Sequence, residues 1–82
     1  MMITNAEIER RLLETNEVSV VKVEGDGYYY QLTVVGDIFL NQSKVARQQW
    51  VYAKLKDLIT TGGLHAITIR TFTKEEWEQK HG

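Results

Sequence analysis

One histidine has the strongest claim on metal chemistry in this chain. His65 follows the glycine pair Gly62-Gly63 and opens an apolar, β-branched stretch, which would leave it at the edge of the domain. An imidazole can bind iron or zinc through one ring nitrogen. One histidine is not a complete metal site, and His81, the other histidine, shares no ligand spacing with it. From the residues alone, a surface or end-capping histidine without a ligand remains the alternative.

A second candidate is the start of the long helix predicted to follow Ser43. Lys44 and Arg47 lie three residues apart, so a helix places them on one side near its first turn. With Ser43 they define a candidate surface for a partner protein or a nucleic acid, and solvated helix surface is the alternative. Trp50 also has two interpretations: an exposed binding anchor, or packing against the loop Ile38–Leu40.

Two further patterns are explained by local structure. Gly25-Asp26-Gly27 lacks the spacing of a phosphate-binding loop and does not precede a helix, so turn chemistry accounts for it. The run Tyr28-Tyr29-Tyr30 could stack nucleobases, but alternate residues of a strand face opposite sides, so at most two share one face. No serine–histidine–carboxylate pattern and no facing pair of carboxylates can be placed, which argues against an enzyme.

The composition limits which partners and which cellular compartment are expected for this chain. The chain has 82 residues, enough for one domain, and a formal net charge of −1, so it lacks the overall positive charge that drives non-specific nucleic-acid binding. It contains no cysteine, which removes disulfides, thiol nucleophiles and any self-sufficient iron–sulfur site of cysteine type. A disulfide-free small domain fits the cytoplasm. No apolar run reaches the roughly 20 residues of a membrane helix, so we expect no membrane contact.

The first half of the chain predicts a helix followed by a hairpin. Thr4 and Glu7 form a capping box at the start of a helix with one apolar face. The valine-rich stretch Val18–Glu24 and the stretch Tyr28–Val35 predict two strands. Because only three residues join them, the two strands should be antiparallel.

The second half predicts a long helix, a strand and a short helix. The long helix begins at the N-cap Ser43 and runs to about Thr60, and His65–Thr71 forms a third strand. A second capping box, Thr73–Glu76, begins the last helix, with Gln79–Gly82 expected to be frayed. The order α–β–β–α–β–α predicts one α+β domain over residues 1–82, a sandwich of helices packed on a three-stranded sheet.

Six short segments, taken in order, match a known family. They are Val23–Gly27, Val35–Phe39, Ser43–Val45, Gln48–Tyr52, Leu64–Ile69 and Thr73–Trp77. Together they resemble BolA-like proteins, and most closely the short IbaG/YrbA branch of that family. The match covers nearly the whole chain, and the ordered set is specific although no single segment is.

The resemblance implies a fold similar to class II KH domains and a partner that supplies sulfur. BolA-like proteins pair with monothiol glutaredoxins, and the pair can share a bridging [2Fe–2S] cluster whose thiolates come from glutaredoxin and glutathione. The isolated chain would then hold no cluster. The family's histidine ligand maps onto His65, which fits a chain without cysteine. Many relatives carry a second ligand, His or Cys, near the first hairpin, where this chain has Tyr29, so that ligand is missing or comes from elsewhere.

These observations predict a non-enzymatic adaptor in iron–sulfur cluster trafficking or iron sensing, in a bacterial cytoplasm. His65 would be the iron ligand, and the partner surface would lie around Ser43, Lys44 and Arg47. The alternative is a DNA-binding transcriptional regulator of stress response or cell morphology that uses the basic residues of the long helix and Arg70. The absent Gly-x-x-Gly loop of KH domains and the net charge weaken it. A third class is an interaction module that binds glutaredoxin without metal. Alone, the chain would be a monomer or a weak homodimer.

Overall fold

The computed structural model describes residues 4–25, 29–60 and 66–81. Within these residues, the elements follow the predicted order α–β–β–α–β–α, which confirms the α+β class. The helices are α1 (Asn5–Leu13), α2 (Lys44–Thr60) and α3 (Lys74–His81), and a short 3₁₀ turn, η1 (Asp37–Phe39), precedes α2. The strands are β1 (Val20–Gly25), β2 (Tyr29–Val35) and β3 (Ala66–Phe72).

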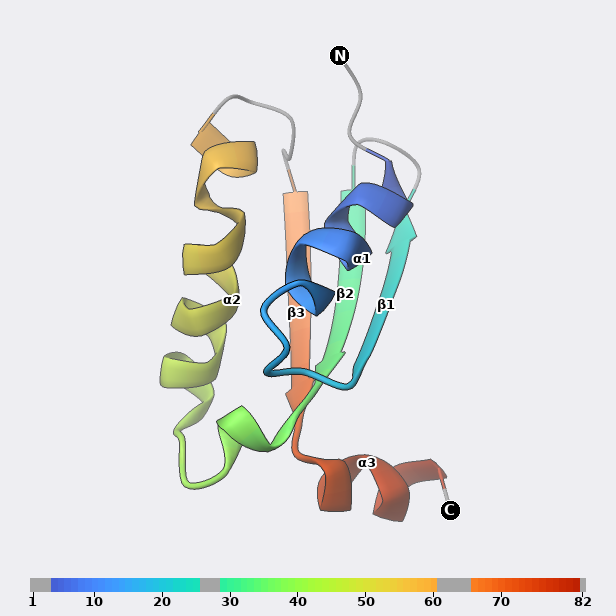
Figure 1. Cartoon of the computed structure of the whole chain (residues 1–82), viewed down its shortest axis with the longest axis vertical. Coiled ribbons are helices and arrows are strands. Elements are labelled where there is room, and N and C mark those ends of the chain that lie inside the picture. Colours follow the sequence, from blue (N-terminus) through green and yellow to red (C-terminus); the bar gives the residue numbers. More distant parts are fainter. Residues whose placement is uncertain (1–3, 26–28, 61–65, 82) are drawn as a thin grey trace.

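The strands form one mixed sheet in the order β1-β2-β3. β1 and β2 are antiparallel, as the tight turn predicted, with Val20 opposite Val35. β3 runs parallel to β2, with Ala66 opposite Tyr29 and Phe72 opposite Val35. A parallel pair needs a crossover connection, and α2 provides it along the edge of the sheet beside β3 (Figure 1).

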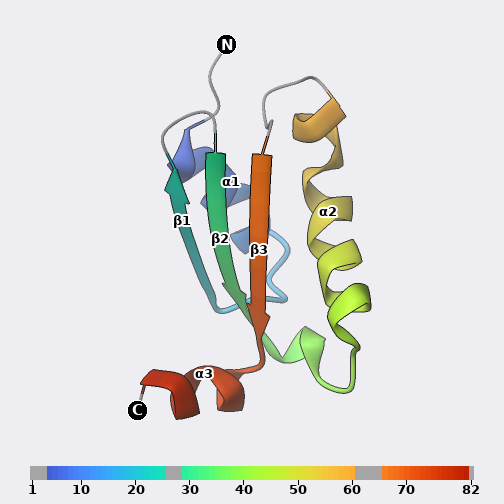
Figure 2. The ribbon, with the colours of Figure 1, turned by 180° about the vertical axis from the view of Figure 1, so that it is seen from behind.

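The core lies between one face of the sheet and the two longer helices. α1 packs against this face, and the view from behind shows the opposite face of the sheet in front of α1, with α2 beside β3 (Figure 2). Alternate residues of β2 are buried on this face, and so is an apolar stripe along α2. The core cluster includes Ile8, Leu12, Val21, Tyr30, Leu32, Val34, Val51, Leu55, Leu58 and Ile69. These alternating and helical spacings explain why the chain forms these elements.

The last helix is better anchored than the sequence indicated. Thr73 N donates to Glu76 Oε1 at 2.7 Å, and Glu76 N donates to Thr73 Oγ1 at 3.2 Å, which confirms the capping box. The Phe72 and Trp77 rings lie 5.4 Å apart across the helix start. The prediction that residues 79–82 fray was wrong as far as residue 81, because α3 continues through that residue. Lys80 contributes as well, with its ammonium 5.4 Å from the centre of the Phe72 ring.

The structure decides between the two interpretations of Trp50: its side chain packs against the loop before α2. Its side chain is half-buried, and its ring meets Phe39 edge-on at 5.6 Å. η1 carries Phe39, so the loop before α2 and the helix itself are joined through this aromatic pair.

Candidate functional site

The first turn of α2 places the three residues predicted as a partner surface. Ser43 caps the helix, and its Oγ accepts a hydrogen bond from Ala46 N at 3.1 Å. The Arg47 side chain, 13% exposed, donates from Nη1 to Glu76 Oε1 at 2.8 Å and from Nε to Gln42 O at 3.1 Å. Arg47 therefore joins α2 to α3, while Lys44 is exposed at the helix start.

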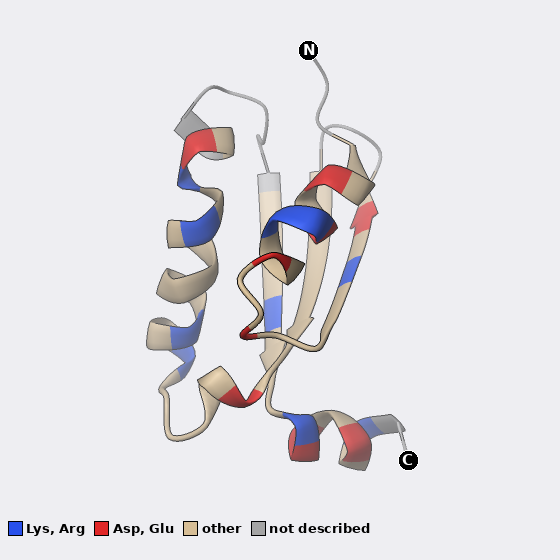
Figure 3. Ribbon diagram, in the orientation of Figure 1, with Lys and Arg blue, Asp and Glu red and all other residues tan. Residues whose placement is uncertain are grey.

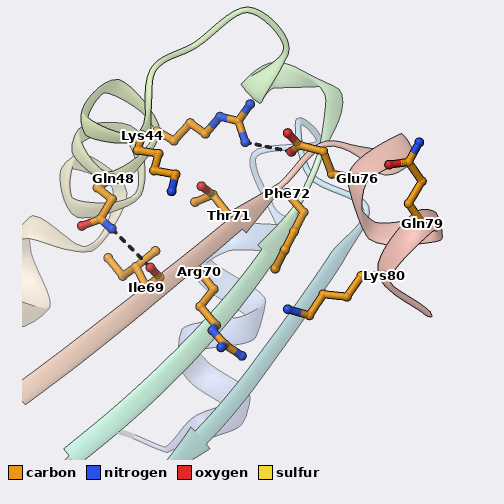
Figure 4. Close-up of a pocket in the computed structure, with 10 residues that line it drawn as sticks. Lys44, Gln48, Ile69, Arg70, Thr71, Phe72, Glu76, Gln79 and Lys80 are labelled. Carbon is orange, nitrogen blue, oxygen red and sulfur yellow. Dashed lines mark hydrogen bonds and ion pairs between the residues drawn. The ribbon is translucent and has the colours of Figure 1, made fainter.

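Lys44 and Arg47 line a groove of about 490 Å³ between α2, β3 and α3 (Figure 4). β3 contributes Arg70, and α3 contributes Glu76 and Lys80. Arg70, named above for the nucleic-acid alternative, therefore lines the same groove as Lys44 and Arg47, and its side chain extends from the other side of β3. The floor includes Ile69, Thr71 and Phe72.

Lys80 is the basic residue of the groove that sequence reasoning missed. It lies in the segment expected to fray, so it was not considered as part of a surface. The signal that could have found it was the capping box together with the aromatic pair Phe72 and Trp77, which stabilise the helix that carries it.

Four cationic side chains and one carboxylate line the groove, so its lining carries a net positive charge. The hydrogen bond from the Arg47 guanidinium, followed by that from the Thr73 amide, holds the pKa of Glu76 below its ordinary value of 4.5. Among the described residues, neither Lys44 nor Arg70 takes part in a salt bridge. Basic residues at the α2 start, on β3 and on α3 can be followed in Figure 3.

An apolar strip on the outer side of α2 adjoins the groove. Val45 is 66% exposed and Tyr52 is 38% exposed, and they lie seven residues, or about two turns, apart on the helix. Gln48 and Gln49 lie between them, and the four side chains with Lys44 line a shallow hollow of about 360 Å³. We call Val45, Gln49 and Tyr52 the α2 strip.

His65, the predicted iron ligand, lies outside the described residues, so that role stays a prediction. Ala66, the next residue in the chain, is opposite Tyr29 in the sheet. Tyr29 is exposed, and its hydroxyl is hydrogen-bonded to Thr68 Oγ1 at 2.7 Å. Over the ranges that the structure covers, no group of three or more His, Cys, Asp or Glu residues could hold a metal ion. In the same ranges no helix has the length and apolar character needed to cross a membrane.

Comparison with known proteins identifies the family. The family model described as BolA-like protein matches residues 6–76. The chain belongs to the BolA-like protein family. This BolA-like protein is 37% identical over 73 residues to the acid stress protein IbaG of Escherichia coli strain K12, across 89% of this chain and 87% of IbaG. It is 29% identical over 82 aligned positions to the DNA-binding transcriptional regulator BolA of Vibrio cholerae, across 88% of this chain and 76% of that protein.

Solved structures confirm the BolA fold. A bolA protein homologue from Coxiella burnetii superposes with a TM-score of 0.81 at 28% identity, covering 94% of this BolA-like protein and 99% of the homologue. The BolA domain of SufE1 from Arabidopsis thaliana gives 0.75 at 27% identity, covering 88% and 93% of the two chains. Yeast Fra2 gives 0.75 at 26% identity, covering 96% and 88%.

Proposed function

We propose that this BolA-like protein is a non-enzymatic adaptor in iron–sulfur cluster trafficking or iron sensing. It acts in the cytoplasm with a monothiol glutaredoxin, and the pair shares a [2Fe–2S] cluster through His65. Membership of the BolA-like family supports the proposal, because the family resemblance implies this partner and this cluster. The observation that carries it is the α2 strip, where Val45 is 66% exposed beside a positive groove.

Protein-binding surfaces commonly combine exposed apolar side chains with charged residues at their border, and the α2 strip has this composition. Val45 and Tyr52 supply apolar area that water solvates poorly, and Lys44 at the border can steer an acidic partner. We therefore place the glutaredoxin contact on the α2 strip, with Lys44 and the capped helix start at Ser43 at its edge. Arg47 holds the first turn of α2 in place, because its guanidinium donates to Glu76 on α3.

The donor set of the chain fits a shared cluster better than one of its own. Iron–sulfur clusters are held chiefly by cysteine thiolates, and this chain has no cysteine. A cluster on this protein therefore needs thiolates from a partner and glutathione, with the His65 imidazole as the ligand from this chain. We assign no ligand role to Tyr29, whose hydroxyl bonds Thr68.

The test is to mix the chain anaerobically with a monothiol glutaredoxin that carries its glutathione-ligated [2Fe–2S] cluster. We expect a one-to-one complex on a sizing column and a new visible absorption and circular dichroism spectrum. Val45→Asp should abolish the complex, whereas Leu13→Asp, at an exposed apolar residue of α1, should leave it intact. A complex that Val45→Asp leaves intact would contradict the assigned surface. A complex with an unchanged spectrum would support the metal-free interaction module instead.

The second candidate function is a DNA-binding regulator, which the positive groove and the named Vibrio cholerae relative favour. Lys44, Arg70 and Lys80 would contact backbone phosphates. The logarithm of the binding constant would then fall with the logarithm of salt concentration by about 0.9 per phosphate contact. A fluorescence-anisotropy titration of duplex DNA between low and physiological salt measures this slope. Undetectable or salt-independent binding would exclude this function.

A further inference from the structure

We propose that the groove between α2, β3 and α3 is a binding site for a small phosphate-bearing ligand, a phosphomonoester or a diphosphate. The inference goes beyond the glutaredoxin adaptor and does not depend on it. It rests on four features of the groove: its uncompensated cations, the engagement of its carboxylate, its fixed walls and its size. None of them involves iron.

Three cations reach the groove from three separate elements. Lys44 comes from α2, Arg70 from β3 and Lys80 from α3, so only the folded chain brings them together. In Figure 4 Lys80 extends from α3 toward Arg70, while Lys44 lies on the other side of β3, beside α2. Like charges that line one groove repel one another, and a bound anion relieves that repulsion.

The groove's own carboxylate leaves this charge uncompensated. Glu76 Oε1 accepts hydrogen bonds from both Arg47 Nη1 and the Thr73 amide. Arg47 and Glu76 therefore neutralise each other, and the net charge of the groove comes from Lys44, Arg70 and Lys80. A ligand with two or more negative charges matches this excess.

The walls of the groove are held in place by hydrogen bonds between elements. Gln48 Nε2 donates to Ile69 O at 3.3 Å, which joins α2 to β3, and the Arg47–Glu76 pair joins α2 to α3. Such fixed walls lower the entropy cost of ordering a site around its ligand.

Size and donor type select the ligand class. A volume of about 490 Å³ lies within the range of roughly 300–1,000 Å³ usual for small-molecule sites. The Arg70 guanidinium can donate two parallel hydrogen bonds to one phosphate group, and Lys44 and Lys80 supply point charges. Thr71 also lines the groove, on the opposite side of β3 from Arg70, because successive residues of a strand face opposite sides.

The test is an NMR titration of the full isolated chain, ¹⁵N-labelled, with inorganic pyrophosphate and with inorganic phosphate, against sodium chloride at matched ionic strength. We expect saturable shifts at the groove residues, with pyrophosphate the tighter probe. Arg70→Gln should weaken pyrophosphate binding about tenfold or more, because a hydrogen bond to a charged group is lost. Lys54→Gln is the matched control, since it removes one charge from α2 about 15 Å along the helix from Lys44.

Each outcome decides the proposal. Shifts at the groove that Arg70→Gln weakens and Lys54→Gln does not would support it. Equal weakening by the two variants would overturn it, since that result shows non-specific attraction of the anion to the charge of the whole protein. Binding of oligonucleotides without pyrophosphate binding would also overturn it, and would favour the nucleic-acid function. Because neither glutaredoxin nor iron is present, failure here leaves the adaptor proposal standing, and success here does not depend on it.

Discussion

Removing the Glu76 carboxylate should loosen α3 and destabilise the whole domain. This carboxylate accepts from the Thr73 amide at 2.7 Å and from Arg47 at 2.8 Å, so it closes the capping box and joins α3 to α2 at once. Glu76→Gln retains an oxygen for the cap but loses the charge. Glu76→Ala loses both contacts.

The expected costs follow from those two contacts. The ion pair is screened because the Glu76 side chain is 48% exposed, so Glu76→Gln should cost about 0.5 kcal/mol. Losing the cap as well adds about 1 kcal/mol, so Glu76→Ala should cost about 1.5 kcal/mol in total. For a domain of this size that corresponds to a fall in Tm of roughly 6–12 °C.

Urea denaturation followed by tryptophan fluorescence measures these costs, since Trp77 lies beside Phe72 at the start of α3. Glu75 supplies the matched control, because it is exposed in the same first turn and Glu75→Ala removes the same charge next to the helix N-terminus. We expect Glu75→Ala to cost less than about 0.5 kcal/mol. Equal costs for Glu75→Ala and Glu76→Ala would refute the assigned role of the capping box and ion pair.

The same carboxylate gives the stability a defined pH dependence. The Arg47 hydrogen bond lowers the pKa of Glu76 in the folded state below its ordinary value of 4.5. The unfolded chain therefore binds this proton more readily, and the contribution is present above pH 4.5 and is lost as the pH falls through the folded pKa. The stability difference between wild type and Glu76→Gln should shrink over that acidic range in urea melts. A difference constant from pH 7 to pH 3 would contradict the assignment.

Three further variants test the fold and the partner surface. Gly36→Ala should cost about 1–3 kcal/mol in thermal melts, because the added Cβ would lie 2.7 Å from Glu17 O and 2.9 Å from Val18 Cα; an unchanged Tm would contradict this packing. Leu55→Ala, in the core, should cost about 2–5 kcal/mol in urea denaturation, and a loss under 1 kcal/mol would place Leu55 outside the core. Val45→Asp should change stability by less than about 0.5 kcal/mol while removing the glutaredoxin complex, and unfolding would make it useless as an interface variant.

Local sequence patterns were sufficient to predict the helices and strands and one of the two strand pairings. The antiparallel pairing of β1 and β2 was predictable because only a short turn separates the two strands. The parallel pairing of β2 and β3 was not, because it depends on how α2 crosses over and packs. Trp50 remained undecided because it lies off the apolar stripe of α2, and its partner Phe39 comes from a preceding turn.

The candidate site was only partly predictable for the same reason. Lys44 and Arg47 could be grouped from sequence because helix geometry alone places residues three apart on one side. Arg70 and Lys80 join them only through the packing of β3 and α3, which no local pattern encodes. The error on the end of α3 arose because fraying was argued from chain position, whereas contacts at the start of α3 and the Lys80–Phe72 contact hold the helix.

The most direct test of the adaptor proposal is pulsed EPR of the reduced cluster in the complex with glutaredoxin. We predict hyperfine coupling to an imidazole nitrogen that is present in the wild-type complex and lost in His65→Ala. The two histidines of the chain provide the control, since His81→Ala should retain the coupling. Coupling that survives His65→Ala, or that is absent from the wild-type complex, would contradict His65 as the iron ligand.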